Sequence, residues 1–409
     1  MAVTSPALVT LEEVHAARAR LGEAIDFSPC PQSIPLSEIT GARIYCKLDN
    51  LQRTGSFKER GARNALLLLT DAQRQRGVIA ASAGNHALGL AYHGGLLGVP
   101  VTVVMPRFAP LIKVATCRRL GATIVQHGDS FQEAREHAAT LAADQRLTYV
   151  HGFDDPAIIA GQGTIALEIL EQVPDVEAIV VPVGGGGLLA GVAVAVKALR
   201  PEVQVIGVEP AAAAGFEAAL AAGRPVRINV GNTLADGLAV ALVGENAFAL
   251  ARPRLDRLVT VSEEFLALAV LRIVEQEKTV VEGAAAAPLA ALLSGQLPEL
   301  AGRRTVLIFS GGNIDPTILS RVIERGLVAD GRLSRFVAIV KDRPGSLATL
   351  ASAIADAGGS IKDVAHDRAF SGADVVSVRV VVTVETRDAG HLAELLASLP
   401  AAGITIAPV

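Results

Sequence analysis

The sequence predicts an α/β fold built on parallel sheets, followed by a smaller unit with a different order of elements. Short apolar, β-branched segments alternate with longer segments rich in Ala and Leu over the first 325 residues. This alternation is typical of parallel strands joined by helices that cover both faces of the sheet. After residue 334 the expected order becomes strand, helix, strand, strand, helix, strand, which is the βαββαβ order of a ferredoxin-like domain.

Strands are predicted wherever a short apolar run is bounded by turn residues. In the first part of the chain they cover residues 78–81, 101–105, 123–127, 148–151, 178–183, 203–208, 258–261 and 305–309. The helices expected between them cover residues 57–69, 86–97, 131–144, 156–172, 188–199, 263–278 and 284–293. Because ligands bind beyond the carboxyl ends of parallel strands, catalytic residues are expected in the loops that follow the strands.

The C-terminal unit is predicted to be separate from the rest of the chain. Its strands are expected at 335–341, 360–370, 374–384 and 404–409, and its helices at 346–357 and 388–399. Residues 326–334 are polar and contain glycine, so they are predicted to be a linker. The length of 409 residues suits such a multidomain organisation: residues 1–325, with a small lobe near 50–150 inserted in a larger one, the linker, and residues 335–409.

Charge and cysteine content exclude several classes of protein. The formal net charge is −4 with no block of like charges, which argues against a nucleic-acid partner or a membrane-binding basic patch. Cys30, Cys46 and Cys117 are widely spaced, so neither a disulfide framework nor a zinc site is expected, and a cytoplasmic location is predicted.

No targeting or membrane-spanning segment is expected. Residues 178–196 carry no charge and have the length of a membrane span, but Pro182 and four glycines interrupt them, so a strand, a loop and a helix are predicted instead. The N-terminus has no pattern of a signal peptide. Thr10 and Glu13 have the spacing of a capping box that opens a helix.

The first motif is Thr54-Gly55-Ser56-Phe57-Lys58. Gly55 permits an unusual turn, and Ser56 is expected to cap the following helix. Lys58 then lies in the first helical turn, where the positive potential of the helix N-terminus favours a neutral amine. A neutral amine is what a Schiff base with an aldehyde requires. Taken alone, Lys58 is more simply a solvated surface lysine.

The second motif is Ser82-Ala83-Gly84-Asn85-His86, directly after the strand at 78–81. Small residues there allow backbone N–H groups to approach an anion at the start of a helix, and a substrate carboxylate fits. Asn85 can offer its amide to a ring hydroxyl. A tight turn with an Asn cap explains this motif equally well.

The third motif is Gly184-Gly185-Gly186-Gly187, between an apolar strand and the next helix. Four residues without Cβ atoms leave a concave set of N–H donors that suits a phosphate. A flexible linker is rarely embedded between two buried elements. A dinucleotide-binding loop stays the weaker alternative, because the glycine spacing is wrong and only Glu209 falls near the position of a ribose-binding carboxylate.

The fourth motif is Ser310-Gly311-Gly312-Asn313, at the end of the strand at 305–309. Ser310 can present a neutral hydroxyl to a heterocyclic nitrogen. The simpler interpretation is a turn with Asn313 as a helix cap.

Together the four motifs resemble those of the fold type II pyridoxal-phosphate (PLP) enzymes, and among these the threonine dehydratase and serine racemase group. TGSFKERGA, SAGNHALG, VGGGGLLAG and SGGN occur in the expected order, each at a strand–helix junction, within residues 10–325. One such motif is weak evidence, whereas four in order are strong.

The resemblance implies a role for each motif. Lys58 would bind the cofactor as a Schiff base, Phe57 would back its ring, Asn85 would bond the ring hydroxyl and Ser310 would face the pyridine nitrogen. The cofactor phosphate would be held by Gly184, Gly185, Gly186, Gly187 and Leu188. The substrate would be bound by Ser82, Ala83, Gly84, Asn85 and His86, with Asp236 and Glu282 at the rim of the site.

The activity implied by this resemblance is β-elimination of L-threonine, and also of L-serine, to 2-oxobutanoate or pyruvate and ammonia. Lys58 and Ser310 would be the catalytic residues, with Lys58 as the base for the α-proton. Serine racemase or another PLP enzyme is the alternative, but Ala83 stands where racemases of the group have a serine that acts as the second acid or base. An amino-acid sensor on an inactive PLP scaffold is a third hypothesis, which the intact Lys58 and glycine loop disfavour.

No metal site is predicted. Racemase-like members place a carboxylate a few residues after the position of Glu209 to hold a divalent ion. Here Glu209 is followed by Pro210, four alanines and Gly215, so half of that ligand set is missing.

The C-terminal unit resembles an ACT domain. The resemblance implies an amino-acid effector, such as isoleucine or valine, because threonine deamination leads toward isoleucine. It also implies pairing of chains, hence a homodimer or homotetramer; a role in oligomerisation alone is the alternative. The effector would bind near the loop made of Asp342, Arg343, Pro344, Gly345 and Ser346.

Overall fold

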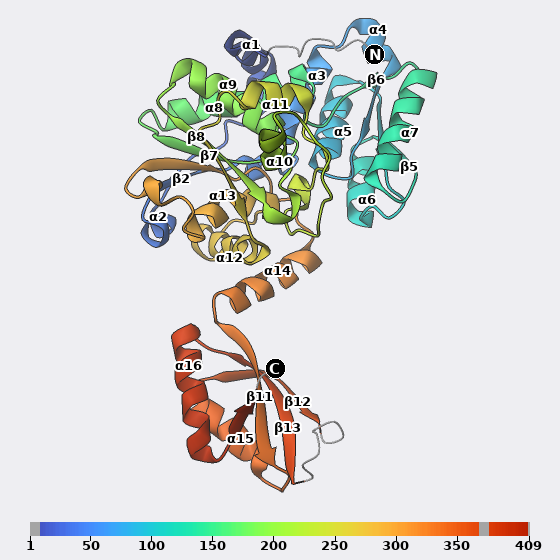
Figure 1. The fold of residues 1–409 in the computed structure, drawn as a ribbon. Coiled ribbons are helices and arrows are strands. Elements are labelled where there is room, and N and C mark those ends of the chain that lie inside the picture. The colour runs from blue at the N-terminus through green and yellow to red at the C-terminus, as the bar shows by residue number, and fades with distance from the viewer. Residues whose placement is uncertain (1–8, 368–375, 408–409) are drawn as a thin grey trace. The chain divides into compact units, whose positions relative to one another are not determined.

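The computed structural model describes residues 9–367 and 376–407. The chain divides into two compact units, Met1–Asp315 and Pro316–Val409, and Figure 1 labels most of their helices and strands. The helices of the first unit are α1 (Leu11–Leu21), α2 (Ile34–Thr40), α3 (Lys58–Leu67), α4 (Asp71–Arg76), α5 (Asn85–Leu97), α6 (Leu111–Arg119), α7 (Phe131–Asp144), α8 (Pro156–Gln172), α9 (Gly187–Leu199), α10 (Gly215–Ala222), α11 (Glu245–Ala251), α12 (Glu263–Arg272) and α13 (Gly283–Leu293).

The larger sheet of the first unit has the strand order β1-β2-β10-β7-β8-β9. Its strands are β1 (Gln32–Ser33), β2 (Arg43–Lys47), β7 (Ala178–Pro182), β8 (Gln204–Pro210), β9 (Arg257–Val261) and β10 (Arg304–Ile308). All neighbours pair in parallel except β1 and β2, which are antiparallel. Helices cover both faces (Figure 1), and every residue of β7 is buried, as the apolar strands of a covered parallel sheet require.

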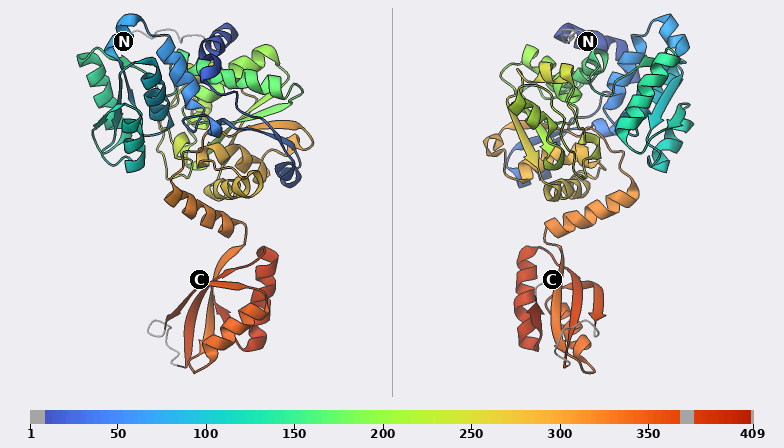
Figure 2. Two further views of the ribbon diagram at one scale, coloured as in Figure 1. Left: turned by 180° about the vertical axis from the view of Figure 1, so that it is seen from behind. Right: turned by 45° about the vertical axis from the view of Figure 1, so that its right-hand side comes forward.

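The smaller sheet forms the second lobe of this unit, with the order β5-β4-β3-β6. Its strands β3 (Val78–Ala81), β4 (Val101–Met105), β5 (Thr123–Gln126) and β6 (Thr148–Tyr149) all pair in parallel. In sequence they lie between β2 and β7, so the small lobe is an insertion in the large one. Figure 2 shows this blue-green lobe beside the large lobe from two further directions. The predicted α/β fold with two parallel-sheet lobes is confirmed.

Most predicted elements agree with the structure to within a few residues, and α7 and α8 have the predicted bounds. The prediction missed the edge strand β1 and its neighbour β2. It also ran the helix at 263–278 too far, because α12 ends at Arg272 and a π-helical turn, Ile273–Glu277, follows. Thr10 accepts from Glu13 and the capping box forms. Residues 178–196 form β7, a loop and most of α9, and no helix in the described part of the chain is long and apolar enough to cross a membrane.

The second unit has the predicted βαββαβ order after a preceding helix. It contains α14 (Pro316–Ala329), β11 (Leu333–Lys341), α15 (Ser346–Asp356), β12 (Ser360–Asp367), β13 (Ser377–Glu385), α16 (Ala389–Ser398) and β14 (Thr405–Ala407). The strands form an antiparallel sheet in the order β12-β13-β11-β14. The predicted linker at 326–334 is largely the end of α14 and the start of β11. The parts of the predicted strands at 368–370, 374–375 and 408–409 lie outside the described residues.

Candidate active site

A cavity of about 590 Å³ lies between the two lobes of the first unit. Residues of all four motifs line it, although more than 250 positions of sequence separate Lys58 from Ser310. It is bounded by the loops after β3, β6, β7 and β10, which is where parallel sheets bind ligands. The residues expected from the sequence that line it are Phe57, Lys58, Ser82, Ala83, Gly84, Asn85, His86, Gly184, Gly185, Gly186, Gly187, Leu188, Asp236, Glu282 and Ser310.

Lys58 lies in the first turn of α3, as predicted, and is its first residue. Its Nζ donates to the carbonyl oxygen of Gly152 at 2.6 Å and lies 5.2 Å from the centre of the Phe57 ring. Burial lowers the pKa of Lys58 to about 8, and the charge of Glu282 only partly opposes this shift. A lysine with this pKa has a much larger neutral fraction near physiological pH than an ordinary lysine, so it can act as a nucleophile toward an aldehyde.

Ser56 does not cap α3, contrary to the expectation from the sequence. Phe57 is the N-cap residue and no side chain caps the helix. Ser56 instead forms an isolated β-bridge with Gly311, and the Phe57 N–H donates to the carbonyl oxygen of Ser310. The first and fourth motifs are therefore joined by backbone pairing, which places Lys58 and Ser310 in the same cavity.

The glycine loop leads from β7 into α9, with Gly186 at the N-cap in the left-handed conformation (φ 91°). A Cβ on Gly185 would lie 2.3 Å from the Phe153 ring, and one on Gly187 would lie 2.3 Å from the Phe153 carbonyl oxygen. No side chain caps α9, and the first N–H groups of a helix have no partner within it. The loop thus presents free donors to the cavity, which fits a phosphate.

A second helix N-terminus faces the same cavity. Gly84 is the N-cap of α5, again without a side-chain cap, while the Gly84 N–H donates to the Ser82 hydroxyl at 3.2 Å. The His86 ring pairs through Nε2 with the carbonyl oxygen of Val150, and its Nδ1 is buried without a partner among the described groups. Burial and the charge of Lys58 lower the pKa of His86 to about 3. His86 is therefore neutral, and it is backbone N–H groups of this loop that can bind a carboxylate.

Asn85 is held by two residues of the large lobe. Its Nδ2 donates to Glu282 Oε1 at 2.8 Å, and its Oδ1 accepts from Asn313 Nδ2 at 2.9 Å. Asn313 also donates to the Thr54 carbonyl oxygen, so it orients the amide of Asn85 rather than capping a helix. One Nδ2 hydrogen of Asn85 remains for a ligand, in keeping with the expected bond to a ring hydroxyl.

Glu282 is the N-cap residue of α13 and is buried at the cavity wall. Burial, and secondarily the nearby Asp236, raise the pKa of Glu282 to about 7. A Cβ on Gly311 would lie 2.7 Å from Glu282 Oε1, so the fourth motif needs glycine at this position. Asp236 itself lies at the cavity rim, 3.6 Å from Lys113 Nζ on α6 of the other lobe.

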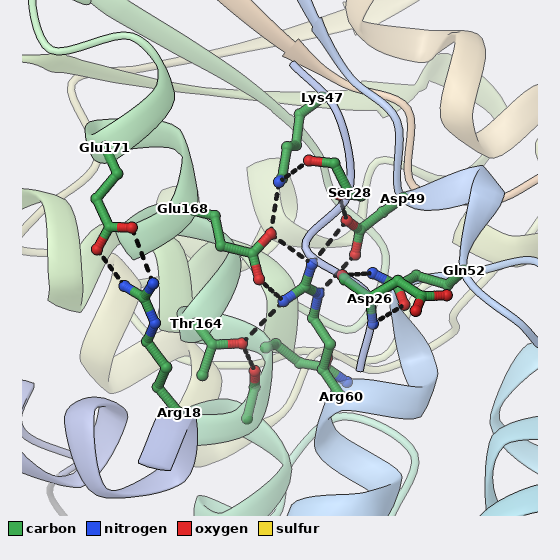
Figure 3. Close-up of polar contacts among 12 residues, drawn as sticks. Arg18, Asp26, Ser28, Lys47, Asp49, Gln52, Arg60, Thr164, Glu168 and Glu171 are labelled. Atoms are coloured by element: carbon green, nitrogen blue, oxygen red, sulfur yellow. Dashed lines mark hydrogen bonds and ion pairs between the residues drawn. The ribbon is translucent and has the colours of Figure 1, made fainter. Parts of the chain in front are cut away.

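An ionic cluster supports α3 on the side of Arg60 (Figure 3). The guanidinium of Arg60, two residues after Lys58, bonds both carboxylate oxygens of Asp49 at 2.7 and 2.9 Å and both oxygens of Glu168. Lys47 Nζ completes it with Glu168 and the Ser28 carbonyl oxygen. Two positive and two negative side chains thus balance in the interior. The cluster links the β2 region, α3 and α8.

Glu209 has a structural contact in this fold. Its carboxylate accepts from the N–H groups of Phe216 and Glu217 at 2.7 and 2.9 Å and so caps α10. Residues 9–367 and 376–407 contain no group of three or more His, Cys, Asp or Glu side chains placed to hold a metal ion. The dinucleotide alternative loses its ribose-binding carboxylate, because Glu209 is buried and engaged at α10.

Several cavity residues were not anticipated from the sequence. His151, Gly152 and Phe153 follow β6, and Lys113 and Arg135 come from α6 and α7. None of them belongs to a motif with recognisable spacing. The only signal available was the position of His151 at the end of the strand predicted at 148–151, with Gly152 and Phe153 directly after it.

Of the five residues proposed for effector binding, Asp342 to Gly345 form the turn between β11 and α15 of the second unit, and Ser346 is the first residue of α15. Gly345 is the N-cap of α15 with φ 91°, a conformation that favours glycine.

The comparisons with known proteins agree with the site. The family described as "Pyridoxal-phosphate dependent enzyme" matches residues 22–311, and the ACT domain matches residues 335–401. The chain is 43% identical to the L-threonine ammonia-lyase of Thermotoga maritima over 98% of this chain and 99% of that protein. It is 41% identical to the catabolic L-threonine dehydratase TdcB of Escherichia coli K12 over 79% of this chain and 98% of that protein.

Solved structures show the same similarity. Threonine deaminase isoform 2 of Solanum lycopersicum, in its processed form, superposes with a TM-score of 0.74 at 36% identity, covering 80% of this chain and 98% of that one. Serine racemase of Dictyostelium discoideum superposes with a TM-score of 0.72 at 34% identity, covering 76% of this chain and 100% of that one. The chain therefore belongs to the pyridoxal-phosphate dependent enzyme family, with an ACT domain at its C-terminal end.

Proposed function

We propose that this protein is an L-threonine ammonia-lyase, which converts L-threonine to 2-oxobutanoate and ammonia and also accepts L-serine, giving pyruvate. The observation that carries the proposal is the arrangement of the cavity. Two helix N-termini without side-chain caps, those of α5 and α9, reach it together with a lysine whose pKa is lowered to about 8. Two anions, a cofactor phosphate and a substrate carboxylate, match these two termini.

Pyridoxal phosphate, when bound, supplies an electron sink for the negative charge that develops at Cα of the substrate. The glycine loop and Leu188 would hold its phosphate, and Ser310 would offer a neutral hydroxyl to its ring nitrogen. Asn85 would use its remaining Nδ2 hydrogen on the ring hydroxyl. Lys58 Nζ would be the base that takes the α-proton.

The cavity favours elimination over racemisation. Racemisation needs a second acid or base on the face opposite Lys58. Ala83 lines the cavity in the motif where a hydroxyl would serve, and it carries no exchangeable proton. The buried His86 has its pKa lowered to about 3 and is a poor proton donor at neutral pH. The serine racemase alternative is therefore the weaker one.

The first test is an absorption spectrum followed by a 2-oxo acid assay with L-threonine and then L-serine. A cofactor band near the edge of the visible range and release of 2-oxobutanoate are expected, and Lys58→Ala should abolish both. A band without any 2-oxo acid would contradict the lyase assignment and favour racemisation or β-replacement. Turnover by Lys58→Ala at the wild-type rate would contradict the role given to Lys58.

We also propose that the ACT domain makes the enzyme responsive to an amino acid, isoleucine or valine, bound near the loop of Asp342 to Ser346. Pairing of ACT domains between chains would make the protein a homodimer or homotetramer. Sedimentation velocity and titration of L-isoleucine and L-valine into the activity assay test these points. An oligomer whose activity responds to neither amino acid would indicate that the domain serves in assembly alone.

Three free cysteines support a cytoplasmic location.

A further inference from the structure

His151 is a cavity residue to which the reaction outlined above gives no role. It lies in the loop after β6, at the carboxyl end of the small sheet, and lines the cavity beside Gly152 and Phe153. Its ring meets the Phe153 ring edge to face, with 4.5 Å between the ring centres. Phe153 packs in turn on Gly185, so Phe153 links His151 to the glycine loop.

The hydrogen bonds of His151 fix its tautomer. The backbone N–H groups of Phe153 and Asp154 both donate to Nδ1, at 3.3 and 3.0 Å. Nδ1 is therefore an acceptor without a proton, and in a neutral ring the proton must be on Nε2. Within residues 9–367 and 376–407 nothing pairs with Nε2. Its N–H is left for a ligand.

The surroundings keep this ring neutral. Burial, then the charges of Arg135 and Lys58, lower the pKa of His151 to about 4. Two of the cations that line the cavity are themselves engaged, since Lys58 donates to the Gly152 carbonyl oxygen and Lys113 pairs with Asp236. A neutral donor suits a neutral acceptor such as a hydroxyl, whereas a cation at this position would favour a second carboxylate.

A β-hydroxy amino acid has three polar groups, and two of them are accounted for. The amine replaces Lys58, and the carboxylate is matched by the N-terminus of α5. We propose, on the basis of the function proposed above, that the Nε2–H of His151 donates a hydrogen bond to the β-hydroxyl of the substrate. It thereby selects hydroxyl-bearing amino acids and stabilises the oxygen as it leaves.

His151 keeps its own proton in this step. Lys58 Nζ takes one proton from Cα, the Cβ–O bond breaks with its electron pair going to oxygen, and the substrate loses hydrogen and hydroxide, together one water. The hydrogen bond from Nε2 strengthens as negative charge develops on the departing oxygen. A leaving group that departs as a stable anion, such as chloride, does not need it.

Two substitutions separate the two nitrogens of the ring. In His151→Asn the amide oxygen can replace the Nδ1 acceptor of the turn, but no N–H reaches the position of Nε2. In His151→Gln the amide N–H can reach that position, while the acceptor is lost from the turn. His137→Asn is the matched control, because His137 stacks on His127 and is not a cavity residue.

The experiment measures kcat/KM of the holoenzymes with L-threonine, L-serine and β-chloro-L-alanine, together with cofactor titration by absorbance. For His151→Asn we expect kcat/KM to fall about tenfold to hundredfold with both hydroxy amino acids, the scale of one lost hydrogen bond to a developing oxyanion. With β-chloro-L-alanine it should change by less than about threefold. Part of the loss should return in His151→Gln, and His137→Asn should match the wild type.

Three results would overturn this inference. The first is an unchanged kcat/KM for threonine in His151→Asn. The second is an equal fall in kcat/KM with all three substrates, which would indicate a role in the turn alone. The third is a loss of cofactor affinity, which would indicate that Nε2–H binds the cofactor phosphate. Failure of the proposed function is seen separately, in wild-type protein that releases no 2-oxo acid from threonine before any variant is compared.

Discussion

Lys58 depends on its surroundings for reactivity. Burial lowers its pKa to about 8, so the neutral amine dominates above about pH 8 and is lost below it. We predict that apoprotein captures pyridoxal phosphate at a rate that rises about tenfold per pH unit below this value and levels off above it. Stopped-flow absorbance would measure this rate.

Lys58→Arg serves as the control for that measurement, because its guanidinium keeps its proton throughout the accessible range. It should show no capture at any pH. A wild-type rate that keeps rising toward pH 10 would mean that Lys58 has the ordinary pKa of a lysine.

Glu282 gives a prediction about stability. Its pKa is raised by burial to about 7 from an unfolded value of 4.5, so the folded state holds this proton more tightly than the unfolded chain does. Its contribution to stability is present below pH 4.5 and is lost as pH rises through 7. We therefore expect the free energy of unfolding of the Glu282→Gln apoprotein, relative to that of the wild type, to rise between pH 5 and pH 8 by up to about 3 kcal/mol.

Urea unfolding of both apoproteins at several pH values would show this difference. The direction of the change matters more than its size. A glutamine variant whose relative stability stays constant over that range would show that Glu282 is ionised in the folded state at pH 5.

At the scale of elements, α3 is held in place by buried charges. Replacing Arg60 with Met would leave the carboxylates of Asp49 and Glu168 in the interior with only Lys47 to balance them. We expect a loss of about 3–5 kcal/mol in the free energy of unfolding, measured by urea denaturation.

The matched control lies in the same region (Figure 3). Arg18 pairs with Glu171 through two hydrogen bonds, but these side chains are 37% and 53% exposed. Arg18→Met should therefore cost no more than about 1 kcal/mol. Equal effects of the two substitutions would show that burial of the Arg60 cluster adds nothing.

The start of α9 gives a second prediction at this scale. Gly186 has φ 91°, and a Cβ there would come within 3.1 Å of Ala247 Cβ. Gly186→Ala should weaken binding of pyridoxal phosphate by tenfold or more, since the loop must shift away from its donor arrangement; the strain itself is about 1–2 kcal/mol. Gly295 has φ 71° and open space around it, so Gly295→Ala should carry similar strain without loss of cofactor affinity in the same titration.

The sequence predicted elements well where the periodicity was strong and local. The apolar strand β7 and the amphipathic α7 were found within a residue. β2 was missed because Arg43 and Lys47 bound its short alternation of buried Ile44 and Cys46. The polar residues after 326 suggested a linker, but α14 continues to Ala329, because its exposed face tolerates polar residues.

For the molecule as a whole, the motifs predicted which residues meet but not how they are held. Lys58 and the glycine loop are local features with a recognisable spacing. Asn313 contacts Asn85, which lies more than 200 positions away in the sequence. The tautomer of His151 is set by backbone N–H groups of the turn that follows it. Such contacts exist only in the folded chain, so spacing in the sequence could not reveal them.

The division of the chain into two units leads to the last prediction. Every residue that lines the cavity belongs to Met1–Asp315. The similarity to the E. coli relative covers 98% of that protein but only 79% of this chain. A protein ending at Asp315 should therefore keep its cofactor band and a kcat of the same order, while losing any response to L-isoleucine or L-valine. Gly345→Ala in the full chain, which strains the turn at φ 91° where nothing lies within 4 Å, should weaken the response without changing basal kcat. A truncated protein that still responds would place the effector site in the catalytic unit.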